Sequence, residues 1–408
     1  MTRAYVAHLD ADCFYVSAER VRHPGLRGRP VGVLGNNGAC VIAKSYEMKA
    51  RGVKTGTPVW DAAKLCPDGV YVKRDFAWYE VLSRKMLAAV GRFAERVEYY
   101  SIDEFFFDAH PLHHKTTFAR TAAGIRDHVH AAAGLPVTIG VARTRTLAKL
   151  FSDTAKPFGA VAVLDRDHER DLLARLAVTE ISGIAEGRAA RLAPYGVRTC
   201  LDLADLDGRL VHKVLTKTGY DLWRELNGER VTPVRPERPA HKALGRGGSL
   251  MGNVLDPRVL WAWCVRHVER LIEELRYHGV RADALGVEVC WKGGGATTGG
   301  APLDAPTDRF DALLDAARVA LRRAYVPRAT ATHLHVLAPR LRPARGQQLT
   351  LFAAPDPKLE RLARAKAAVN DKLGRFKVRS AATLYLPAVY ADPANDLDIC
   401  DVRGKVCF

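Results

Sequence analysis

Two acidic residues stand between two strand-like runs in the first third of the chain. Val97–Tyr100 and Phe105–Asp108 are rich in β-branched and aromatic residues, and Asp103 and Glu104 lie between them. Neighbouring strand residues point to opposite faces, so both acids can serve one site only where the backbone turns. A polar hairpin turn is the simpler interpretation. The flanking runs favour a pair of carboxylates at the rim of a buried sheet.

A second acidic pair closes the first apolar run of the chain. Asp10 and Asp12 follow Tyr5–Leu9, so they too stand where a strand is expected to end. Carboxylates at strand ends can converge on hard cations. Mg²⁺ prefers a few carboxylates plus substrate phosphates, and two such ions about 3.5–4 Å apart clamp the oxygens of a phosphoryl transfer. The two pairs therefore predict a nucleotidyl transferase site.

Several segments match a known family in the family's own order. They are Leu9–Tyr15, Val41–Glu47 with Gly52–Gly56, Ser101–Glu104 and Ala155–Pro157. On these segments the chain resembles the Y-family translesion DNA polymerases, densely over the first 165 residues and loosely to about residue 340. Within that family, Val33–Gly38 and Gln348–Phe352 resemble the branch that contains the catalytic subunit of bacterial DNA polymerase V.

The resemblance implies an α+β multidomain fold with the layout of a right hand. It has a ferredoxin-like palm, small fingers, a helical thumb of the helix-hairpin-helix type and an α/β little finger. The expected ranges are 1–12 and 77–165 for the palm, 13–76 for the fingers, 166–238 for the thumb, 239–340 for the little finger and 341–408 for a basic tail. From Lys242 the pattern itself predicts strand, helix, strand, helix and strand, with Asp256 capping the first helix and Pro257 at its first position.

The same resemblance assigns roles to the acids. Asp10 and Asp103 would bridge two Mg²⁺ ions, for which Mn²⁺ can substitute. Glu104 would hold the ion that activates the primer hydroxyl, and the Ala11 carbonyl would complete a coordination shell. Asp12 is expected to accept hydrogen bonds from nearby backbone and not to bind metal.

Nucleotide contacts are also implied by matching positions. Tyr15 matches the family's steric gate, which would exclude a 2′-hydroxyl; the alternative is an aromatic residue that only packs. Tyr46, Lys49 and Lys156 match triphosphate contacts, although lone lysines usually solvate a surface. No Walker-type glycine loop is present to bind the phosphates instead.

Further positively charged or glycine-containing segments border this region. A helix is predicted over about Thr146–Ala155, with Arg143, Arg145 and Lys149 near it, free to meet DNA or to stay in water. Ser182–Ala185 resembles half of a helix-hairpin-helix turn, whose backbone N–H groups bind phosphate. Ala185 replaces the usual second glycine, which leaves that phosphate contact open.

Composition supports a polyanionic partner independently of the resemblance. The chain has 62 Lys and Arg against 45 Asp and Glu, a net charge of +17 and a pI near 9.6, and basic proteins gain affinity for nucleic acid by releasing counterions. No apolar run has the length of a membrane span or a signal peptide, so a cytoplasmic, nucleoid-associated protein is expected. The eight Cys form no Cys-x-x-Cys pair, which favours free thiols over a zinc site.

Three other segments have compositions that occur in binding sites. His110, His113 and His114 are interpreted as a solvated loop, and Lys292–Gly300 as a flexible hairpin connection. Gln348–Phe352 matches the bacterial sliding-clamp binding motif. Leu351 and Phe352 would enter an apolar pocket, with Leu349 beside them and the Gln348 amide at its edge. The alternative is an edge strand.

The function predicted from these features is a template-directed, error-prone DNA polymerase that copies damaged DNA in the SOS response. Its partners would be primer-template DNA, deoxynucleoside triphosphates and the sliding clamp, with a polymerase V type accessory dimer and a recombinase filament as further candidates. A catalytically inactive, polymerase-shaped adaptor is the main alternative, and a palm-type nucleotide cyclase the third. The complete acid set favours the enzyme. The basic tail with its clamp-type motif has no use in a cyclase.

Overall fold

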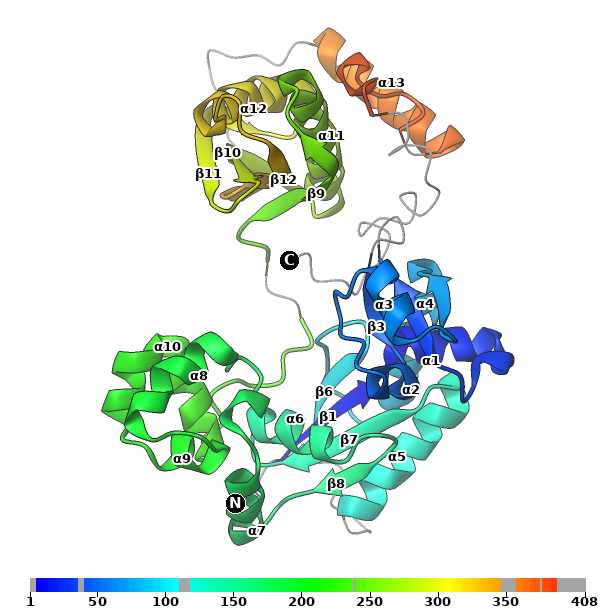
Figure 1. Ribbon diagram of the computed structural model, residues 1–408, viewed down its shortest axis with the longest axis vertical. Helices are drawn as coiled ribbons and strands as arrows, with labels where there is room; N and C mark the ends of the chain where they lie inside the picture. The colour runs from blue at the N-terminus through cyan, green and yellow to red at the C-terminus, as the bar shows by residue number, and fades with distance from the viewer. Residues whose placement is uncertain are drawn as a thin grey trace. The chain divides into compact units, whose positions relative to one another are not determined.

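Two compact units make up the chain, Met1–Arg238 and Pro239–Phe408. Figure 1 shows them in the computed structural model, which describes residues 5–35, 40–109, 118–237, 240–345, 357–374 and 376–386. Both units combine helices with strands; the first contains antiparallel and parallel strand pairs, and the described strands of the second pair antiparallel. The predicted α+β multidomain class is confirmed.

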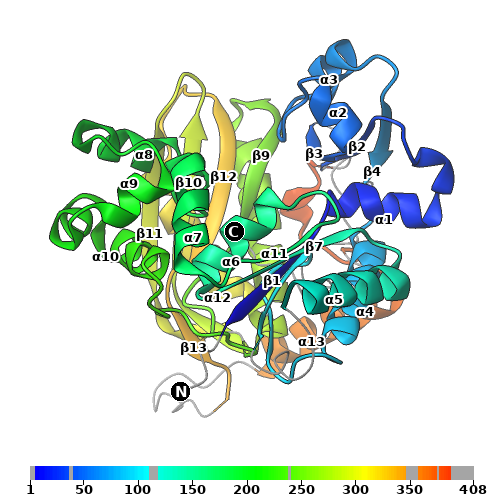
Figure 2. The ribbon, with the colours of Figure 1, turned by 90° about the horizontal axis from the view of Figure 1, so that it is seen from below.

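A five-stranded sheet forms the centre of the first unit. In spatial order its strands are β5 (Val97–Tyr99), β6 (Glu104–Asp108), β1 (Val6–Ala11), β7 (Val137–Ala142) and β8 (Ala160–Ala162). All six residues of β1 are buried because helix α6 (Arg145–Thr154) covers one face of the sheet, whereas α4 (Phe76–Val90) and α5 (Phe118–Ala133) cover the other (Figure 2). Polar side chains on β1 therefore lie inside the protein or at the strand's end.

Helix α6 is packed tightly against the sheet. Thr144 caps its N-terminus by accepting a hydrogen bond from the Leu147 backbone N–H. Leu147, Leu150 and Phe151 enter the core that continues into the helical module described below. A Cβ added at Gly140 of β7 would lie 2.4 Å from the Ala148 carbonyl oxygen, so only glycine permits this approach of helix and strand.

A smaller sheet is inserted in the sequence between β1 and β5 of the central sheet, and a helical module follows β8. The smaller sheet has the order β3 (Val41–Lys44), β2 (Val31–Leu34) and β4 (Val70–Lys73), with α1 (Phe14–Arg22), η1 (Pro24–Leu26), α2 (Tyr46–Ala50) and α3 (Val59–Leu65) around it. The helical module contains α7 (Arg166–Arg175), η4 (Val178–Glu180), α8 (Glu186–Leu192), η5 (Ala193–Tyr195), α9 (Cys200–Asp205) and α10 (Gly208–Leu226). These elements correspond to the small fingers and helical thumb of the predicted fold class.

The segment after α10, residues 228–237, is fastened to the edge of the central sheet. Arg96 donates to the Val234 carbonyl (2.8 Å), the Arg235 N–H donates to Glu98 (3.0 Å) and Arg230 pairs with Asp108 (2.9 Å). This segment, called the anchored link below, thus belongs mechanically to the first unit.

The second unit is a four-stranded antiparallel sheet covered by helices. Its sheet order is β11 (Ala296–Thr307), β10 (Val280–Trp291), β12 (Ala331–Ala338) and β9 (Leu244–Val254), with the short β13 (Leu341–Pro343) pairing β10, and its first helices are α11 (Pro257–Tyr277) and α12 (Phe310–Ala324). The Asp256 side chain accepts from the Arg258 N–H and Pro257 opens α11, as predicted. Leu260, Leu271 and Leu275 lie in the core between sheet and helices.

The predicted flexible connection at Lys292–Gly300 is wrong in extent. The hairpin turn is short, with Gly293–Gly295 at positive φ, and β11 already begins at Ala296. Helix α12 passes close to Gly299 of this strand. A Cβ at this position would lie 2.1 Å from the Ala320 carbonyl oxygen, so the approach requires glycine. Glycine in this case serves close packing and not flexibility.

Part of the basic tail is folded onto the second unit. Helix α13 (Pro357–Leu373) and η6 (Ala381–Thr383) follow the strands. Buried Glu269 of α11 accepts from Lys366 (2.6 Å) and from the Ser380 N–H (3.0 Å). Leu386, in a region for which the sequence suggested no role, lies in the core of this unit.

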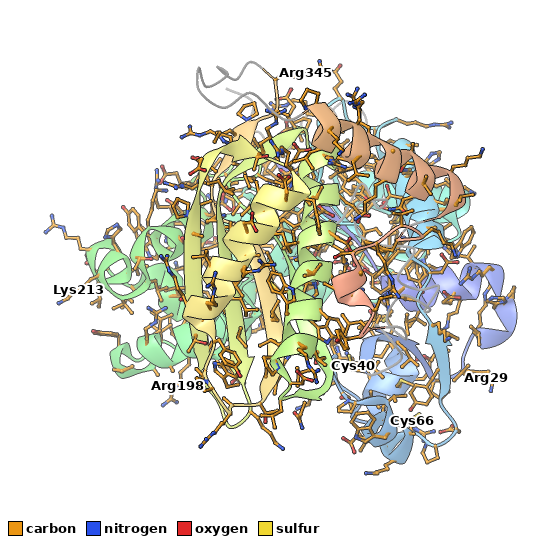
Figure 3. All side chains as sticks on the ribbon, turned by 90° about the horizontal axis from the view of Figure 1, so that it is seen from above. Arg29, Cys40, Cys66, Arg198, Lys213 and Arg345 are labelled. Carbon is orange, nitrogen blue, oxygen red and sulfur yellow. The ribbon has the colours of Figure 1, made fainter. Side chains whose placement is uncertain are left out.

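The surface and the thiols agree with the sequence analysis. Exposed basic side chains such as Arg29, Arg198 and Lys213 project outward (Figure 3). The six cysteines in the described residues, Cys40 and Cys66 among them, are free thiols, as expected. Among the helices of the described residues, none combines the length and apolarity needed to cross a membrane.

Candidate active site

Asp10 and Glu104 are brought together by the pairing of two strands. Asp10 is the fifth residue of β1 and Glu104 the first of β6, and they stand directly opposite each other in the antiparallel register. Directly paired residues lie on the same face of a sheet. The register thus joins two acids that are more than ninety positions apart in the chain, and the hairpin turn considered as the simpler interpretation is what delivers Glu104 to this place.

Two lysines hold these carboxylates. Lys156 Nζ lies 2.7 Å from Asp10 Oδ1 and 2.7 Å from Asp153, and Lys149 of α6 pairs with Glu104. Burial raises the pKa of Asp10 well above its ordinary value against the opposing charge of Lys156, and Glu104 and Asp103 add to the rise. Burial alone would lower the pKa of Lys156, but its two carboxylate partners outweigh burial and raise it.

Asp103 lies in the turn between β5 and β6, next to this cluster. Its carboxylate accepts from the Ser101 hydroxyl (2.5 Å), and its backbone carbonyl accepts from the Ala11 N–H (3.0 Å). Burial raises the pKa of Asp103, with Glu104 acting in the same direction. The backbone bond ties the turn to the end of β1, so Asp103 and Ala11 are held beside Asp10.

Asp12 behaves as expected for a residue that organises backbone. Its carboxylate accepts from the Phe158 N–H (2.7 Å) and from the hydroxyl of Thr138 on β7 (3.0 Å). Its own N–H donates to the Pro136 carbonyl. Asp12 therefore fastens the turn after α6, where Lys156 stands, to the central sheet.

His8 is a member of the cluster that the sequence analysis missed. One ligand atom from each of His8, Asp10 and Glu104 falls within 4.8 Å of the others. The His8 side chain is fully buried, and burial together with the charges of Lys149, Lys156 and Arg145 lowers its pKa well below the ordinary value. Its position two residues before Asp10 on the same strand face was a visible signal, because residues i and i+2 share a face.

Three of the residues predicted to contact a nucleotide, Tyr15, Tyr46 and Lys49, lie on α1 and α2, whereas Lys156 follows α6. The Tyr15 ring is partly exposed and stacks on Tyr79, with ring centres 4.6 Å apart and an angle of 19°. Tyr46 on α2 is 37% exposed, and burial with the nearby charge of Asp12 raises its pKa. Lys49, one turn further along α2, is exposed. Tyr15 therefore packs and still presents part of its ring to solvent.

The basic residues around α6 do not stay in water. Arg143 makes a two-pronged pair with Glu169 (3.0 Å at Nε), Arg145 pairs with Glu98, and Lys149 pairs with Glu104. These three side chains thus form ion pairs in the described structure, and their contact with DNA stays a prediction. Their acidic partners come from other elements, so no local sequence pattern announced them.

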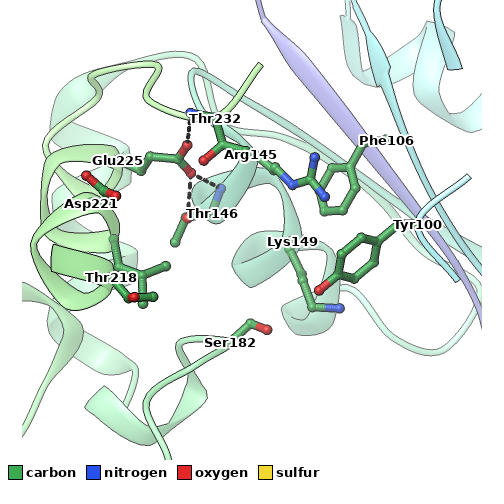
Figure 4. A pocket seen from close by; sticks show the side chains of 11 residues that line it. Tyr100, Phe106, Arg145, Thr146, Lys149, Ser182, Thr218, Asp221, Glu225 and Thr232 are labelled. Carbon is green, nitrogen blue, oxygen red and sulfur yellow. Dashed lines mark hydrogen bonds between the residues drawn. The ribbon is translucent and has the colours of Figure 1, made fainter. Parts of the chain in front are cut away.

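A pocket of about 230 Å³ opens beside Lys149 (Figure 4). Phe106 of β6 and Tyr100, which follows β5, line it from the central sheet. Arg145 lines it from α6, and Ser182 and Thr218 line it from the helical module. Its floor includes Glu225, whose carboxylate accepts from Thr146 and from the Thr232 N–H, as the dashed lines show. Hydroxyl, cationic and carboxylate groups therefore line a space beside Lys149, which pairs with Glu104 of the acidic cluster.

Comparison with known proteins places the chain in a family. The model of the impB/mucB/samB family matches residues 9–153, and the model of that family's C-terminal domain matches residues 241–351. DNA polymerase IV of Bacillus velezensis is 31% identical over 316 residues, which cover 76% of each chain. The chain belongs to the Y family of DNA polymerases.

Further comparisons agree with this membership. DNA polymerase IV 2 of Mesorhizobium japonicum is 33% identical over 318 residues, covering 78% of this chain and 75% of the relative. A solved Y-family DNA polymerase chimera of Dbh and Dpo4 has a TM-score of 0.70 at 24% identity and covers 82% of this chain and 98% of its own. The relatives named here are called DNA polymerase IV. Membership of this chain in the polymerase V branch therefore stays a prediction.

The donor set fits the divalent metal ions that Y-family polymerases use. Two carboxylates and a buried imidazole point their ligand atoms at one place, which is the kind of set that binds a dication in proteins. Asp103 could join it by rotating its side chain away from Ser101. The ligand atoms of Asp10 and Glu104 lie close to each other in this Y-family member, and the roles of Asp10, Ala11, Asp103 and Glu104 as metal ligands stay predictions.

Two sequence predictions lie outside the described residues: the clamp-type motif at 348–352 and the histidine loop at His110–His114. The predicted hairpin turn at Ser182–Ala185 is described. Gly183 has a φ of +98°, and Ala185 caps α8 without a side-chain hydrogen bond. The element before the turn is the short η4 and not a long helix, so phosphate binding at this turn stays a prediction.

Proposed function

We infer that this chain is a template-directed DNA polymerase of the translesion type, a DNA-directed nucleotidyltransferase. The observation that carries the inference is the Asp10–Glu104 pair, which strand register sets at the end of β1 in a chain of Y-family membership. An adaptor without chemistry would have no use for paired carboxylates compensated by two lysines. The adaptor alternative is not supported.

Mg²⁺ is the ion we propose for this site, held by Asp10, Asp103, Glu104 and the Ala11 carbonyl. When bound, two such ions would activate the primer hydroxyl and neutralise charge on the phosphates. Carboxylate oxygens and a backbone carbonyl are the ligands that Mg²⁺ prefers, and Mn²⁺ can replace it in such a set. The chain's part is to hold these oxygens on two strand ends, where their positions are fixed by the sheet.

The lysines at the site have a second task in this proposal. Lys156 now shares its ammonium between Asp10 and Asp153. Bound Mg²⁺ would neutralise the carboxylates in place of Lys156. Lys156 would then contact the phosphates of a deoxynucleoside triphosphate, together with Tyr46 and Lys49. Lysine acts there as a point charge, without the bidentate fork of arginine.

Tyr15 would select deoxyribonucleotides by shape. Its ring is held from one side by stacking on Tyr79 and from its edge by Phe76, at 5.7 Å between ring centres. A ring fixed on two sides cannot retreat from a sugar placed against its free face. A 2′-hydroxyl would then collide with it.

The wider assignments rest on the sequence. We propose that Gln348, Leu349, Leu351 and Phe352 bind the sliding clamp, and that the polymerase works on primer-template DNA in the cytoplasm, at the nucleoid. A polymerase V type accessory dimer and a recombinase filament are proposed as further partners if the chain belongs to that branch. The charge of +17 supports the DNA partner without distinguishing among the protein partners.

The test is primer extension on undamaged and lesion-bearing templates. Asp103→Asn should abolish Mg²⁺-dependent extension and leave primer-template affinity nearly unchanged, because it removes one proposed ligand charge and not the basic surface. Asp127→Asn is the matched control, because Asp127 lies on the exposed face of α5. Wild-type protein without extension on any template would refute the polymerase. An active Asp103→Asn variant would refute only the ligand assignment.

A further inference from the structure

His8 stands at the bottom of the candidate metal site, on the central strand of the sheet. Its side chain has no exposed surface and lies on the same face of β1 as Asp10. The Phe106 ring packs against the imidazole at 4.6 Å between centres. The ring therefore has one orientation, and the direction of each of its nitrogens is set.

The hydrogen bond at Nδ1 determines what Nε2 can do. His8 Nδ1 lies 2.8 Å from the Ser152 hydroxyl oxygen, and that hydroxyl donates its own hydrogen to the Lys149 carbonyl (2.7 Å). Ser152 must then accept from Nδ1–H, which assigns the tautomer. Nε2 has no hydrogen-bond partner among the described residues. It keeps a lone pair, as a metal-ligating imidazole does when its other nitrogen donates a hydrogen bond.

That lone pair faces the two carboxylates. Nε2 lies 3.8 Å from Glu104 Oε1, too far for a hydrogen bond, and all three ligand atoms are mutually within 4.8 Å. Two ligands bonded to one ion at about 2.0–2.2 Å are separated by roughly 3–4 Å. The 3.8 Å between His8 and Glu104 is thus the spacing of two ligands of one ion, and the Asp10 ligand atom lies within 4.8 Å of both.

We propose that His8 Nε2 supplies a nitrogen ligand to this site, so that it takes a transition-metal dication together with Asp10 and Glu104. A set of one imidazole and two carboxylates suits Zn²⁺ or Co²⁺ better than Mg²⁺, which prefers oxygen alone. The inference rests on the proposed function, since it assumes that the acidic cluster holds a divalent ion. It adds that the free polymerase discriminates among metals through His8.

The lysines define how such an ion enters. Lys149 and Lys156 occupy the carboxylates in the absence of a metal, so binding has to displace both ammonium groups from Glu104 and Asp10. Lys149→Met should therefore strengthen Zn²⁺ binding, whereas removal of His8 weakens it. Opposite effects at neighbouring positions separate ligation from general destabilisation.

The experiment uses the full chain, treated with chelator, without DNA or nucleotide. Histidine is labelled with ¹⁵N and Zn²⁺ is titrated in. The lone-pair resonance of His8 Nε2, identified by its loss in His8→Phe, should shift with one equivalent of Zn²⁺. His8→Phe should bind Zn²⁺ at least about tenfold more weakly, whereas His168→Phe, which removes an exposed imidazole on α7, should not.

A second variant guards against a misfolded His8→Phe. Glu104→Gln retains His8 and its bond to Ser152, and it should weaken the Zn²⁺-induced shift of the His8 signal if both residues hold one ion. An unshifted Nε2 signal in wild-type protein that has bound Zn²⁺, or the absence of one-to-one binding, overturns the inference. Because no extension is measured, a chain that copies DNA with Mg²⁺ and leaves His8 unmetallated would fail this inference alone.

Discussion

Tyr15 combines packing with a possible contact to substrate, and the two can be separated by mutation. Its ring belongs to a cluster with Phe14, Phe76 and Tyr79. The ring on which it stacks, Tyr79, is fully buried. Aromatic pairs of this kind contribute about 0.5–1.5 kcal/mol beyond the area that they bury. Replacing the ring by a methyl group therefore costs stability in either interpretation, so stability alone cannot identify the gate.

Tyr15→Ala should raise ribonucleotide incorporation relative to deoxyribonucleotide by about tenfold or more, because the rejection is steric and a methyl group leaves room for the 2′-hydroxyl. Tyr15→Phe, which keeps the ring, should retain the selectivity of the wild type. The measurement is the ratio of kcat/KM for the two nucleotides. An unchanged ratio in a folded Tyr15→Ala protein would make Tyr15 a packing residue only.

The positions of the acidic residues were easier to predict from the sequence than the residues that contact them. Asp10 and Glu104 could be predicted because each ends or begins a strand-like run, which the structure confirms. His8 was missed although it lies two residues before Asp10 on the same strand face, whereas the place of Lys149 could not be predicted because it depends on how α6 lies across the sheet. Asp12 was expected to accept hydrogen bonds from nearby backbone, which its bond to the Phe158 N–H confirms.

One carboxylate joins helix α10 to helix α6 and to the anchored link. Glu225 is buried and accepts from the Thr146 N–H, the Thr146 hydroxyl and the Thr232 N–H at 2.6–2.9 Å. It thereby connects the end of α10, the first turn of α6 and the anchored link. A negative charge at the first turn of α6 is also favoured by the helix dipole.

Glu225→Ala should lower the free energy of unfolding by about 2–4 kcal/mol, because three donors lose their acceptor inside the protein. Glu229→Ala is the matched control. Glu229 is exposed and pairs with Arg224, so its loss should leave stability nearly unchanged. Urea unfolding followed by circular dichroism compares the two. Equal midpoints for both variants would contradict the role assigned to Glu225.

Strand β11 and helix α12 test the close-packing interpretation of glycine. Gly299→Ala should destabilise the second unit by about 1–3 kcal/mol, because its Cβ would meet the Ala320 carbonyl at 2.1 Å and force the helix outward. Gly300→Ala, next along the strand, meets nothing closer than 3.8 Å and should be tolerated. Thermal unfolding of both variants gives the comparison. A tolerated Gly299→Ala would mean that α12 can move.

Among the elements, caps and periodicity were reliable and glycine-rich segments were not. Asp256 and Pro257 correctly predicted the start of α11, and the apolar spacing from Leu147 to Phe151 is that of the predicted helix α6. The first half of β11 has few residues of high strand propensity, so its conformation follows from pairing with β10 and from the helix above it. Such tertiary pairing leaves no local signal in a sequence.

For the whole molecule, excess charge gathers in one region. Residues 340–380 contain eleven Lys and Arg against three acids, 11 − 3 = +8 of the +17. Part of this charge is used within the second unit, where Lys366 pairs with Glu269. The remainder can follow the phosphates of DNA, with an affinity that falls as salt rises.

Leu351 and Phe352 should matter only when a clamp is loaded. Replacing both by Ala should weaken binding to immobilised clamp by a factor of tens to hundreds, about 2–4 kcal/mol, since pocket-filling anchors dominate short-peptide interfaces. Extension without clamp should stay near that of the wild type. The control is Leu359→Ala with Leu362→Ala, two exposed leucines of α13. Unreduced clamp affinity in the Leu351/Phe352 variant would show that the contact lies elsewhere.

The anchored link sets the reach of the second unit. Arg235 is bound to Glu98, and β9 begins at Leu244, nine residues later, so the fully extended chain between them spans about 30 Å at most. A tether this short gives an effective local concentration in the millimolar range. If the second unit loses its hold on a duplex while the first remains bound, rebinding is an intramolecular event. The polymerase then leaves DNA only if the second unit and the first both dissociate before either has rebound. Its residence time on DNA therefore depends on the length of the tether as well as on the contacts.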